Sequence, residues 1–193
     1  IIPKRYAGYI TTAVELLAGI PSVIYGIFGL GLIVPVIKML PSNTFPQGNS
    51  LLATGLVLAV MILPTIIAIS VTSIKAVPKY YKEASLGLGA TKIQTIFKVV
   101  LPAAKSGLFA SVVLGVGRAI GETMAVILVA GNVSGGLPES IFAPIRPLTA
   151  NIAMDLSYAS GLHAEALFTT ALVLFIFIFV INVMVQKLIK GGK

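Results

Sequence analysis

Long apolar runs separated by short polar segments dominate the pattern of this chain. Two runs are plain: residues 51–74 contain no charged residue, and residues 163–186 lead into a lysine-rich tail. At 1.5 Å of rise per residue, a helix of about 20 residues crosses the roughly 30 Å apolar core of a bilayer. Each of these runs therefore predicts one membrane-spanning helix.

Two further apolar runs are interrupted. Residues 9–37 contain Glu15 and the sequence Gly19-Ile-Pro21, which predicts an interfacial or tilted helix that kinks near Pro21 before crossing the membrane. Residues 106–132 predict a third span. Together the four runs predict an all-α polytopic membrane bundle, and we expect residues 1–193 to form one domain.

The loops between these runs are rich in proline and glycine. Prolines and small polar residues mark a loop over 35–50, and a longer loop covers 132–161 with a short helix expected over 148–156. Pro64 lies in the middle of the second run and predicts a kink there.

The polar segment 78–102, which we call the elbow, predicts two short helices joined by a tight turn. Pro78 suits the first turn of a helix because its missing N–H would be unpaired there, and Gly89 suits the left-handed position just after a helix end. These signals predict a first helix over 79–88.

The second half of the elbow begins with a capping box. Thr91 is followed three residues later by Gln94, a spacing at which each side chain satisfies a backbone N–H beside the other. We expect a helix from 92 to about Leu101, where Pro102 removes a backbone donor. A polar segment of this size in so apolar a chain predicts contact with a partner.

Composition fits a membrane protein and excludes several site types. The chain is 57% hydrophobic and 10% charged, against about 25% charged residues in soluble domains. It has no cysteine and one histidine, which excludes thiolate and histidine-built metal centres. We expect no cofactor in this chain. It starts at Ile1 without a signal-peptide pattern, so we expect one or more further helices upstream.

Basic residues indicate the orientation. They are concentrated at the two ends and around the elbow: Lys4, Arg5, Lys75, Lys79, Lys82, Lys92, Lys98, Lys105, Lys187, Lys190 and Lys193. The loops between hold Lys38 and Arg146. Because cytoplasmic segments of membrane proteins carry an excess of Lys and Arg, both termini and the elbow are predicted to be cytoplasmic.

Two charges fall inside the predicted third span. Arg118 lies about 18 Å along a helix from Ser106, just past the bilayer midplane, where a charge costs about 3 kcal/mol and needs a partner or water. Glu122 follows four residues later, on the same helical face. The pair can be a structural lock between helices or can border a transport pathway. The pathway is favoured because Ser111 and Gly115 extend that face as a small, polar-tolerant stripe beside further glycines. In a pathway, the planar guanidinium of an arginine suits a tetrahedral oxyanion.

The elbow carries a family resemblance. It reads Glu83-Ala84-Ser85, three residues, Gly89, nine residues and Val99-Val100-Leu101-Pro102, which resembles the EAA loop of type I ABC importer permeases. Ser85 replaces the usual alanine and Val99 the usual isoleucine. The resemblance implies that Glu83, Ala84, Ser85 and Gly89 couple the permease to an ATPase subunit.

The rest of the chain is similar to permeases of phosphate ABC importers, closer to the PstC type than to the PstA type. The residues that carry this are Glu15 to Gly26, Gly117 to Val126 and Ser160 to His163. The resemblance implies a transport pathway at Arg118 and Glu122 in a multi-pass protein of a bacterial or archaeal cell membrane. It implies a PstA-type second permease subunit, an ATPase dimer that holds ATP and Mg²⁺, and an extracytoplasmic phosphate-binding protein.

Other functions stay open on the residues alone. An arginine in a polar stripe does not choose phosphate over sulfate or molybdate, and a membrane scaffold or signalling subunit could use the elbow without moving a solute. An enzyme is the least favoured alternative, because the few acids are scattered, and no Gly-x-x-x-x-Gly-Lys-Ser/Thr loop is present to bind a nucleotide. His163 is expected to cap or orient the last helix rather than to bind a ligand.

Overall fold

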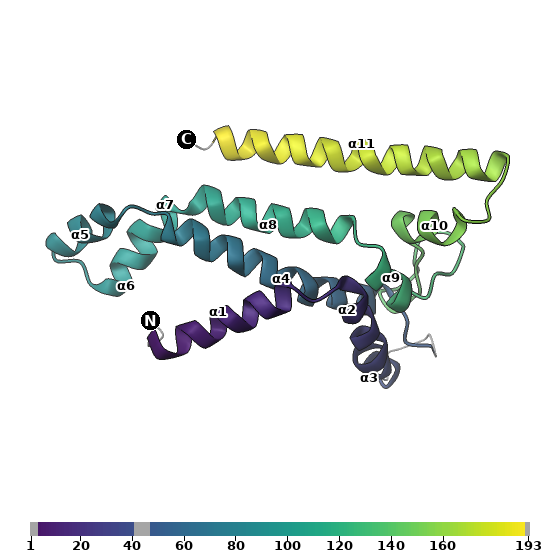
Figure 1. Cartoon of the computed structure of the whole chain (residues 1–193), viewed down its shortest axis with the longest axis horizontal. Coiled ribbons are helices and arrows are strands. Elements are labelled where there is room, and N and C mark those ends of the chain that lie inside the picture. The colour runs from purple at the N-terminus through teal and green to yellow at the C-terminus, as the bar shows by residue number, and fades with distance from the viewer. Residues whose placement is uncertain (1–3, 41–46, 192–193) are drawn as a thin grey trace. The chain divides into compact units, whose positions relative to one another are not determined.

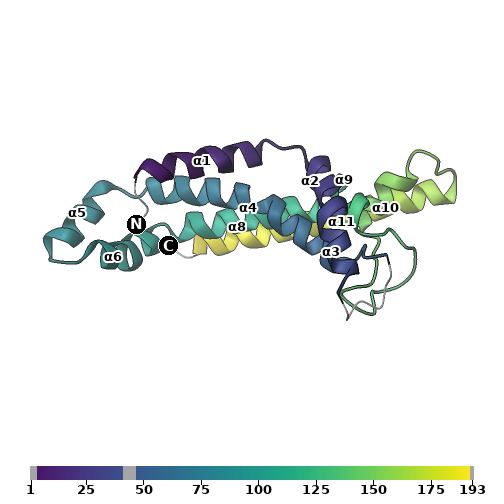
Figure 2. The ribbon, with the colours of Figure 1, turned by 90° about the horizontal axis from the view of Figure 1, so that it is seen from below.

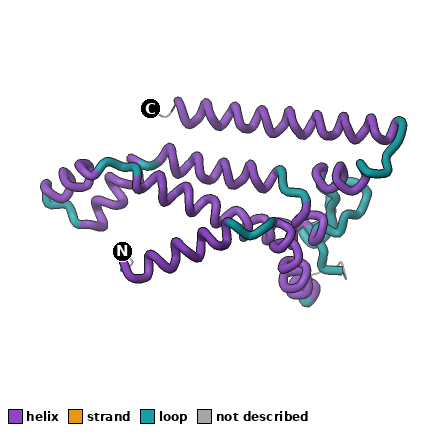
Figure 3. Tube along the Cα trace, viewed as in Figure 1, coloured by secondary structure: helices purple, strands orange, loops and turns teal. Residues whose placement is uncertain are grey.

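The structure is a computed structural model that describes residues 4–40 and 47–191, so the predicted loop residues 41–46 lie outside it (Figure 1). Within the described residues the chain is helical and has no strand, only an isolated bridge between Gly131 and Ile145 (Figure 3). The predicted all-α class is confirmed. The elements are α1 (Lys4–Ala18), α2 (Ser22–Phe28), η1 (Gly29–Ile33), α3 (Val34–Lys38), α4 (Leu51–Lys75), α5 (Lys79–Gly87), α6 (Lys92–Thr95), η2 (Ile96–Val100), α7 (Leu101–Ala103), α8 (Lys105–Ile120), α9 (Met124–Val129), α10 (Leu148–Asp155) and α11 (Leu162–Gly191).

Among the described residues, two helices are long and apolar enough to cross a membrane. They are α4 and the Leu162–Met184 part of α11, which confirms the two plain runs as helices. Two bent pairs raise the number to four if each pair is one span: Gly8–Ala18 with Ser22–Lys38, and Lys92–Ala103 with Lys105–Ile120, the latter bent by 65°. α4 runs through Pro64 as one helix.

The other two predicted spans are interrupted more strongly than expected. Instead of one kinked helix near Pro21, α1 ends at Ala18 and α2 begins at Ser22, with Pro21 in extended conformation between them. A proline lacks the N–H that would continue the helix and pushes the preceding residue out of helical conformation. The continuous helix predicted over 106–132 is wrong: α8 ends at Ile120 and α9 starts at Met124.

Two helices accommodate a proline by widening the turn that precedes it. The π-helical turn η1 ends just before α3, whose second residue is Pro35, and η2 ends just before α7, whose second residue is Pro102. A π turn upstream makes room for the ring against the preceding carbonyl. The second elbow helix therefore continues past Pro102 to Ala103, beyond the end predicted at Leu101.

The chain divides into two compact units, which we describe separately. The elbow unit comprises the described residues of Ile1–Ala18, Leu63–Val116 and Asn182–Lys193, and the break unit those of Gly19–Ile62 and Gly117–Ile181. In the elbow unit, buried Val77, Val100 and Ala104 pack with Ile74 and Leu108, which fixes the elbow to the ends of α4 and α8.

The core of the break unit lies where α2, η1, α3, α9 and the first half of α4 meet (Figure 2). Its buried members are Val34, Ile37, Ala53, Val57, Ala125 and Val129. At Gly26, a Cβ would lie 2.8 Å from the Cα of Ala125, closer than real Cβ atoms come. The absence of a side chain at Gly26 is what lets α2 and α9 pack together.

The first turn of α4 is closed by segments far along the chain. Three N–H groups donate to distant carbonyls: Ser50 to Val129 (3.2 Å), Leu51 to Ala143 (2.9 Å) and Leu52 to Ile141 (2.8 Å). The Ser50 hydroxyl accepts from the N–H of Ala53 at 3.1 Å. The donors left over at a helix start are thus satisfied by the α9 end and the loop after it.

Candidate coupling elbow and transport site

The turn of the elbow forms as its sequence predicts. Gly89 has a φ of +84°, the left-handed conformation that follows a helix end, after α5 ends at Gly87. The Thr91 N–H donates to Gln94 Oε1 at 2.9 Å, and the Gln94 N–H donates to Thr91 Oγ1 at 3.2 Å. The predicted capping box is confirmed, and the elbow is stabilised locally on both sides of its turn.

The predicted coupling residues lie on two faces of α5. Glu83 and Ala84 are exposed, as is Gly89 at the turn, whereas Ser85 is half-buried against the second elbow helix. There the Ser85 and Thr95 hydroxyl oxygens lie 3.0 Å apart, and Thr95 is buried. Glu83, Ala84 and Gly89 are therefore available to a partner, and Ser85 holds the two helices of the elbow together.

An open groove of roughly 470 Å³ lies on the inner side of the elbow. Its walls are mostly apolar, with two lysines among them: Ile74, Lys82, Leu86, Lys92, Thr95, Ile96, Val100 and Leu101. Lys82 and Leu86 are one helical turn apart, so they line the groove from one face of α5, and Ala84 lies on the opposite face of that helix.

Small residues connect the helices that carry the elbow. The Ser70 and Ser111 hydroxyl oxygens are 2.8 Å apart, and Ser111 also donates to the Leu108 carbonyl at 2.7 Å. A Cβ at Gly107 would collide with the Ser73 side chain, so α8 packs closely on the end of α4. Close packing through small residues and hydroxyl pairs is typical of membrane helices.

The predicted transport residues lie on either side of a helix break. Arg118 is exposed in the last turn of α8, and Glu122 is half-buried after the helix has ended. One carboxylate oxygen of Glu122 accepts from the Ala125 N–H at 3.2 Å, so this side chain caps the start of α9. The shared helical face on which an Arg118–Glu122 pair was predicted does not extend to Glu122.

A second contact to Glu122 comes from α10. The Thr149 hydroxyl, in the first turn of α10, donates to the Glu122 backbone carbonyl at 3.0 Å. Carbonyls past the end of a helix lack helical donors and need one from elsewhere. No sequence signal links these two residues, which are 27 positions apart.

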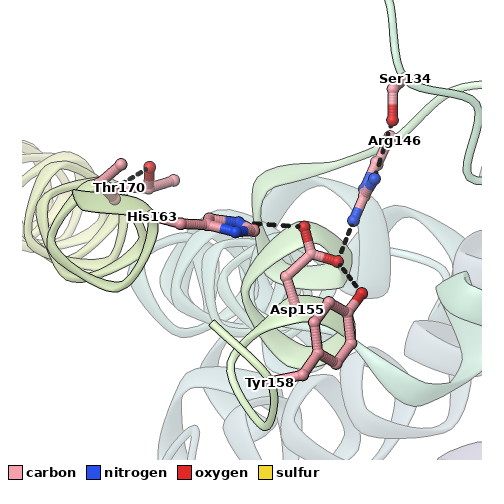
Figure 4. Close-up of polar contacts among 7 residues, drawn as sticks. Ser134, Arg146, Asp155, Tyr158, His163 and Thr170 are labelled. Carbon is pink, nitrogen blue, oxygen red and sulfur yellow. Dashed lines mark hydrogen bonds and ion pairs between the residues drawn. The ribbon is translucent and has the colours of Figure 1, made fainter. Parts of the chain in front are cut away.

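A polar cluster joins α10, the loop before it and the start of α11 (Figure 4). Asp155 receives Arg146 Nη2 at 2.5 Å and the Tyr158 hydroxyl at 2.6 Å, and His163 Nε2 lies 3.5 Å from its other oxygen. Arg146 Nη1 also donates to the Ser134 hydroxyl at 2.8 Å. The side chains of Arg146 and Asp155 are only 18% and 13% exposed, so the pair is largely shielded from water.

The electrostatics of this cluster favour an ionised Asp155. The hydrogen bond from Tyr158 lowers the pKa of Asp155 most, Arg146 and His163 lower it further, and partial burial opposes them. The same hydrogen bond raises the pKa of Tyr158. The sequence pattern marked Arg146 only as a basic loop residue and did not predict this cluster; His163 was expected to cap or orient the last helix. A signal was available, since charged residues are sparse in this segment.

No group of three or more His, Cys, Asp or Glu side chains that could hold a metal ion occurs in the described part of the chain. The two predicted sites are therefore an exposed turn on the elbow and an arginine beside a capped helix break.

Comparison with known proteins agrees with these features. The family described as binding-protein-dependent transport system inner membrane component matches residues 2–191. The chain is 40% identical to the phosphate transport system permease protein PstC of Pasteurella multocida, over 91% of this chain and 60% of that protein. It is 43% identical to the probable ABC transporter permease protein YqgH of Bacillus subtilis, over 100% of this chain and 62% of that protein.

A third relative, the PstC permease protein of Mesorhizobium japonicum, is 37% identical over 94% of this chain and 61% of its own length. The chain thus spans about three fifths of the curated relatives it matches. No solved structure matches it. Because the family match covers nearly the whole chain, the chain belongs to the binding-protein-dependent transport system inner membrane components.

Proposed function

We propose that this chain is the greater part of a permease subunit that imports inorganic phosphate through a cell membrane, driven by ATP hydrolysis on a separate subunit. The observation that carries the proposal is the elbow. It leaves Glu83, Ala84 and Gly89 exposed, and it is fixed to α4 and α8 through a buried core. Several relatives are named as phosphate transport permeases.

Coupling follows from the way the elbow is built. The elbow is a stiff unit because three sets of contacts hold it together. They are the capping box of Thr91 and Gln94, the Ser85–Thr95 contact, and the buried core of Val77, Val100 and Ala104. A push from an ATPase dimer holding ATP and Mg²⁺ would be transmitted to α4 and α8 rather than absorbed within the elbow. The elbow and both termini of this chain face the cytoplasm in this proposal.

Substrate selection is assigned to Arg118, with Glu122 setting the conformation of the break beside it. An arginine holds a tetrahedral oxyanion through paired donors, and a pathway must bind the ion loosely enough to release it. An extracytoplasmic phosphate-binding protein would deliver the ion, and a PstA-type subunit would complete the pathway.

The test is uptake of labelled phosphate by the full-length permease reconstituted with its partner subunits. Arg118→Ala is expected to abolish uptake while the complex with the ATPase still assembles. Arg118→Lys keeps the positive charge but loses the paired donors of the guanidinium, so it should retain a small part of the uptake. Normal uptake by Arg118→Ala would refute the assignment.

Two alternatives are decided by the same preparation. A permease for sulfate or molybdate would take up that labelled ion in preference to phosphate. A scaffold or signalling subunit would bind the ATPase without ion-stimulated hydrolysis.

A further inference from the structure

Two ends of α10 make two different contacts, both within the break unit. Near its start, Thr149 donates to the carbonyl of Glu122, and at its end Asp155 receives Arg146 and Tyr158. Thr149, Glu122 and Asp155 are all half-buried. α10 is therefore fixed to the helix break at one end and to its own flanking segments at the other.

The contact at Glu122 lies beside the cap of α9. One carboxylate oxygen of Glu122 accepts from the Ala125 N–H and its backbone carbonyl accepts from Thr149, so side chain and backbone of this residue are both hydrogen-bonded. A displacement of α10 would pull on the carbonyl and so reorient the residue that caps α9. The Asp155 cluster fixes where α10 can lie, since it joins α10 to Arg146 before it and to His163 in the first turn of α11.

We propose that Thr149 is a positioning residue for transport: through its hydroxyl, α10 holds Glu122 and with it the α8–α9 break, and Asp155 fixes α10 in place. The inference rests on the proposed function, which gives the α8–α9 break its role in transport. It goes beyond that function by naming α10, which lies outside the predicted pathway, as the element that controls the break.

The experiment compares Thr149→Val with Thr149→Ser in the full-length permease, reconstituted with its partner subunits in liposomes. Valine keeps the shape of threonine and removes the hydroxyl, whereas serine keeps the hydroxyl. Two readouts are taken: the kcat and KM of phosphate uptake, and the distance distribution between spin labels at Met124→Cys and Ser157→Cys. Both label positions are exposed, and this chain has no cysteine of its own.

We expect Thr149→Val to broaden the distance distribution and to lower kcat by about two- to tenfold, the range that one neutral hydrogen bond is worth, with little change in KM. Thr149→Ser should restore both. Asp155→Asn, tested because it acts from the other end of α10, should broaden the distribution in the same way. Glu139→Gln, which changes an exposed carboxylate of the same loop, is the matched control.

An unchanged kcat in Thr149→Val, or equal impairment in Thr149→Ser and Thr149→Val, would overturn the proposal. The distance readout separates it from the proposed function. If Arg118→Ala transports phosphate normally while Thr149→Val still broadens the distribution, the tie to α10 stands and the assignment of the pathway fails.

Discussion

Ser85 and Thr95 face each other across the elbow with 3.0 Å between their hydroxyl oxygens, and Thr95 is only 4% exposed. This pair links the first elbow helix, which carries the exposed Glu83 and Ala84, to the second, which leads into α8. A force applied to the first helix reaches the second through a specific contact rather than through the turn alone.

Removing one hydroxyl of this pair should destabilise the elbow. Ser85→Ala leaves the buried Thr95 hydroxyl without this partner, and we expect a loss of about 1 kcal/mol of unfolding free energy. The double variant Ser85→Ala/Thr95→Val removes both groups and should recover most of it. Thermal unfolding of the purified permease, followed by circular dichroism, checks the order of the three proteins. A double variant less stable than Ser85→Ala would contradict the pairing.

An alanine should be tolerated less well at Gly89 than at Gly87, two residues earlier. At a φ of +84° an alanine is strained by about 1–2 kcal/mol, and the turn that joins α5 to α6 would shift. We expect Gly89→Ala to reduce substrate-stimulated ATP hydrolysis by the assembled transporter. Gly87→Ala is the control, because Gly87 is helical with open space around its Cα. Equal hydrolysis rates in the two variants would count against a strained turn.

The packing of α2 on α9 should depend on Gly26. In Gly26→Ala the new Cβ would meet the Ala125 backbone at 2.8 Å, and overpacking of this kind costs about 1–3 kcal/mol. Gly31→Ala adds the same methyl group where nothing lies within 4 Å. A lower melting temperature for Gly26→Ala than for Gly31→Ala is the expected result, and its reversal would show that α2 does not approach α9 this closely.

The Asp155 cluster should loosen in acid. The folded pKa of Asp155 lies below its usual 3.8, so the cluster contributes stability that is fully present above that value and is lost as the pH falls through the lowered pKa. In a titration downward from pH 6, a spin label at the exposed Ser160→Cys should gain mobility once the pH falls through that lowered pKa. With Asp155→Asn the label should be more mobile at pH 6 and lack that acid step. The same acid step in both proteins would exclude Asp155 as its origin.

The elements that sequence predicted well depend on neighbours in the chain. The capping box needs only Thr91 and Gln94, and the turn needs only Gly89 after a helix, so local stereochemistry decides both. The two uninterrupted apolar runs became α4 and the membrane-crossing part of α11 for the same reason.

The features that sequence did not predict depend on distant contacts. Gly121 directly follows the last residue of α8, but a single glycine inside an apolar run is a weak stop signal. The hydrogen bond from Thr149 to the Glu122 carbonyl, 27 residues away, leaves no mark in the sequence. The Asp155 cluster likewise forms only because the fold brings Arg146, Asp155 and the start of α11 close together. The proline at 102 was recognised, but the π turn that carries a helix past it was not, since a widened turn leaves no mark in the hydropathy pattern.

The closure of the first turn of α4 bears on how the protein is made. Three N–H groups at its start are hydrogen-bonded to the carbonyls of Val129, Ile141 and Ala143. These three residues are synthesised long after α4. During synthesis that end of α4 must be hydrated or held by the insertion machinery.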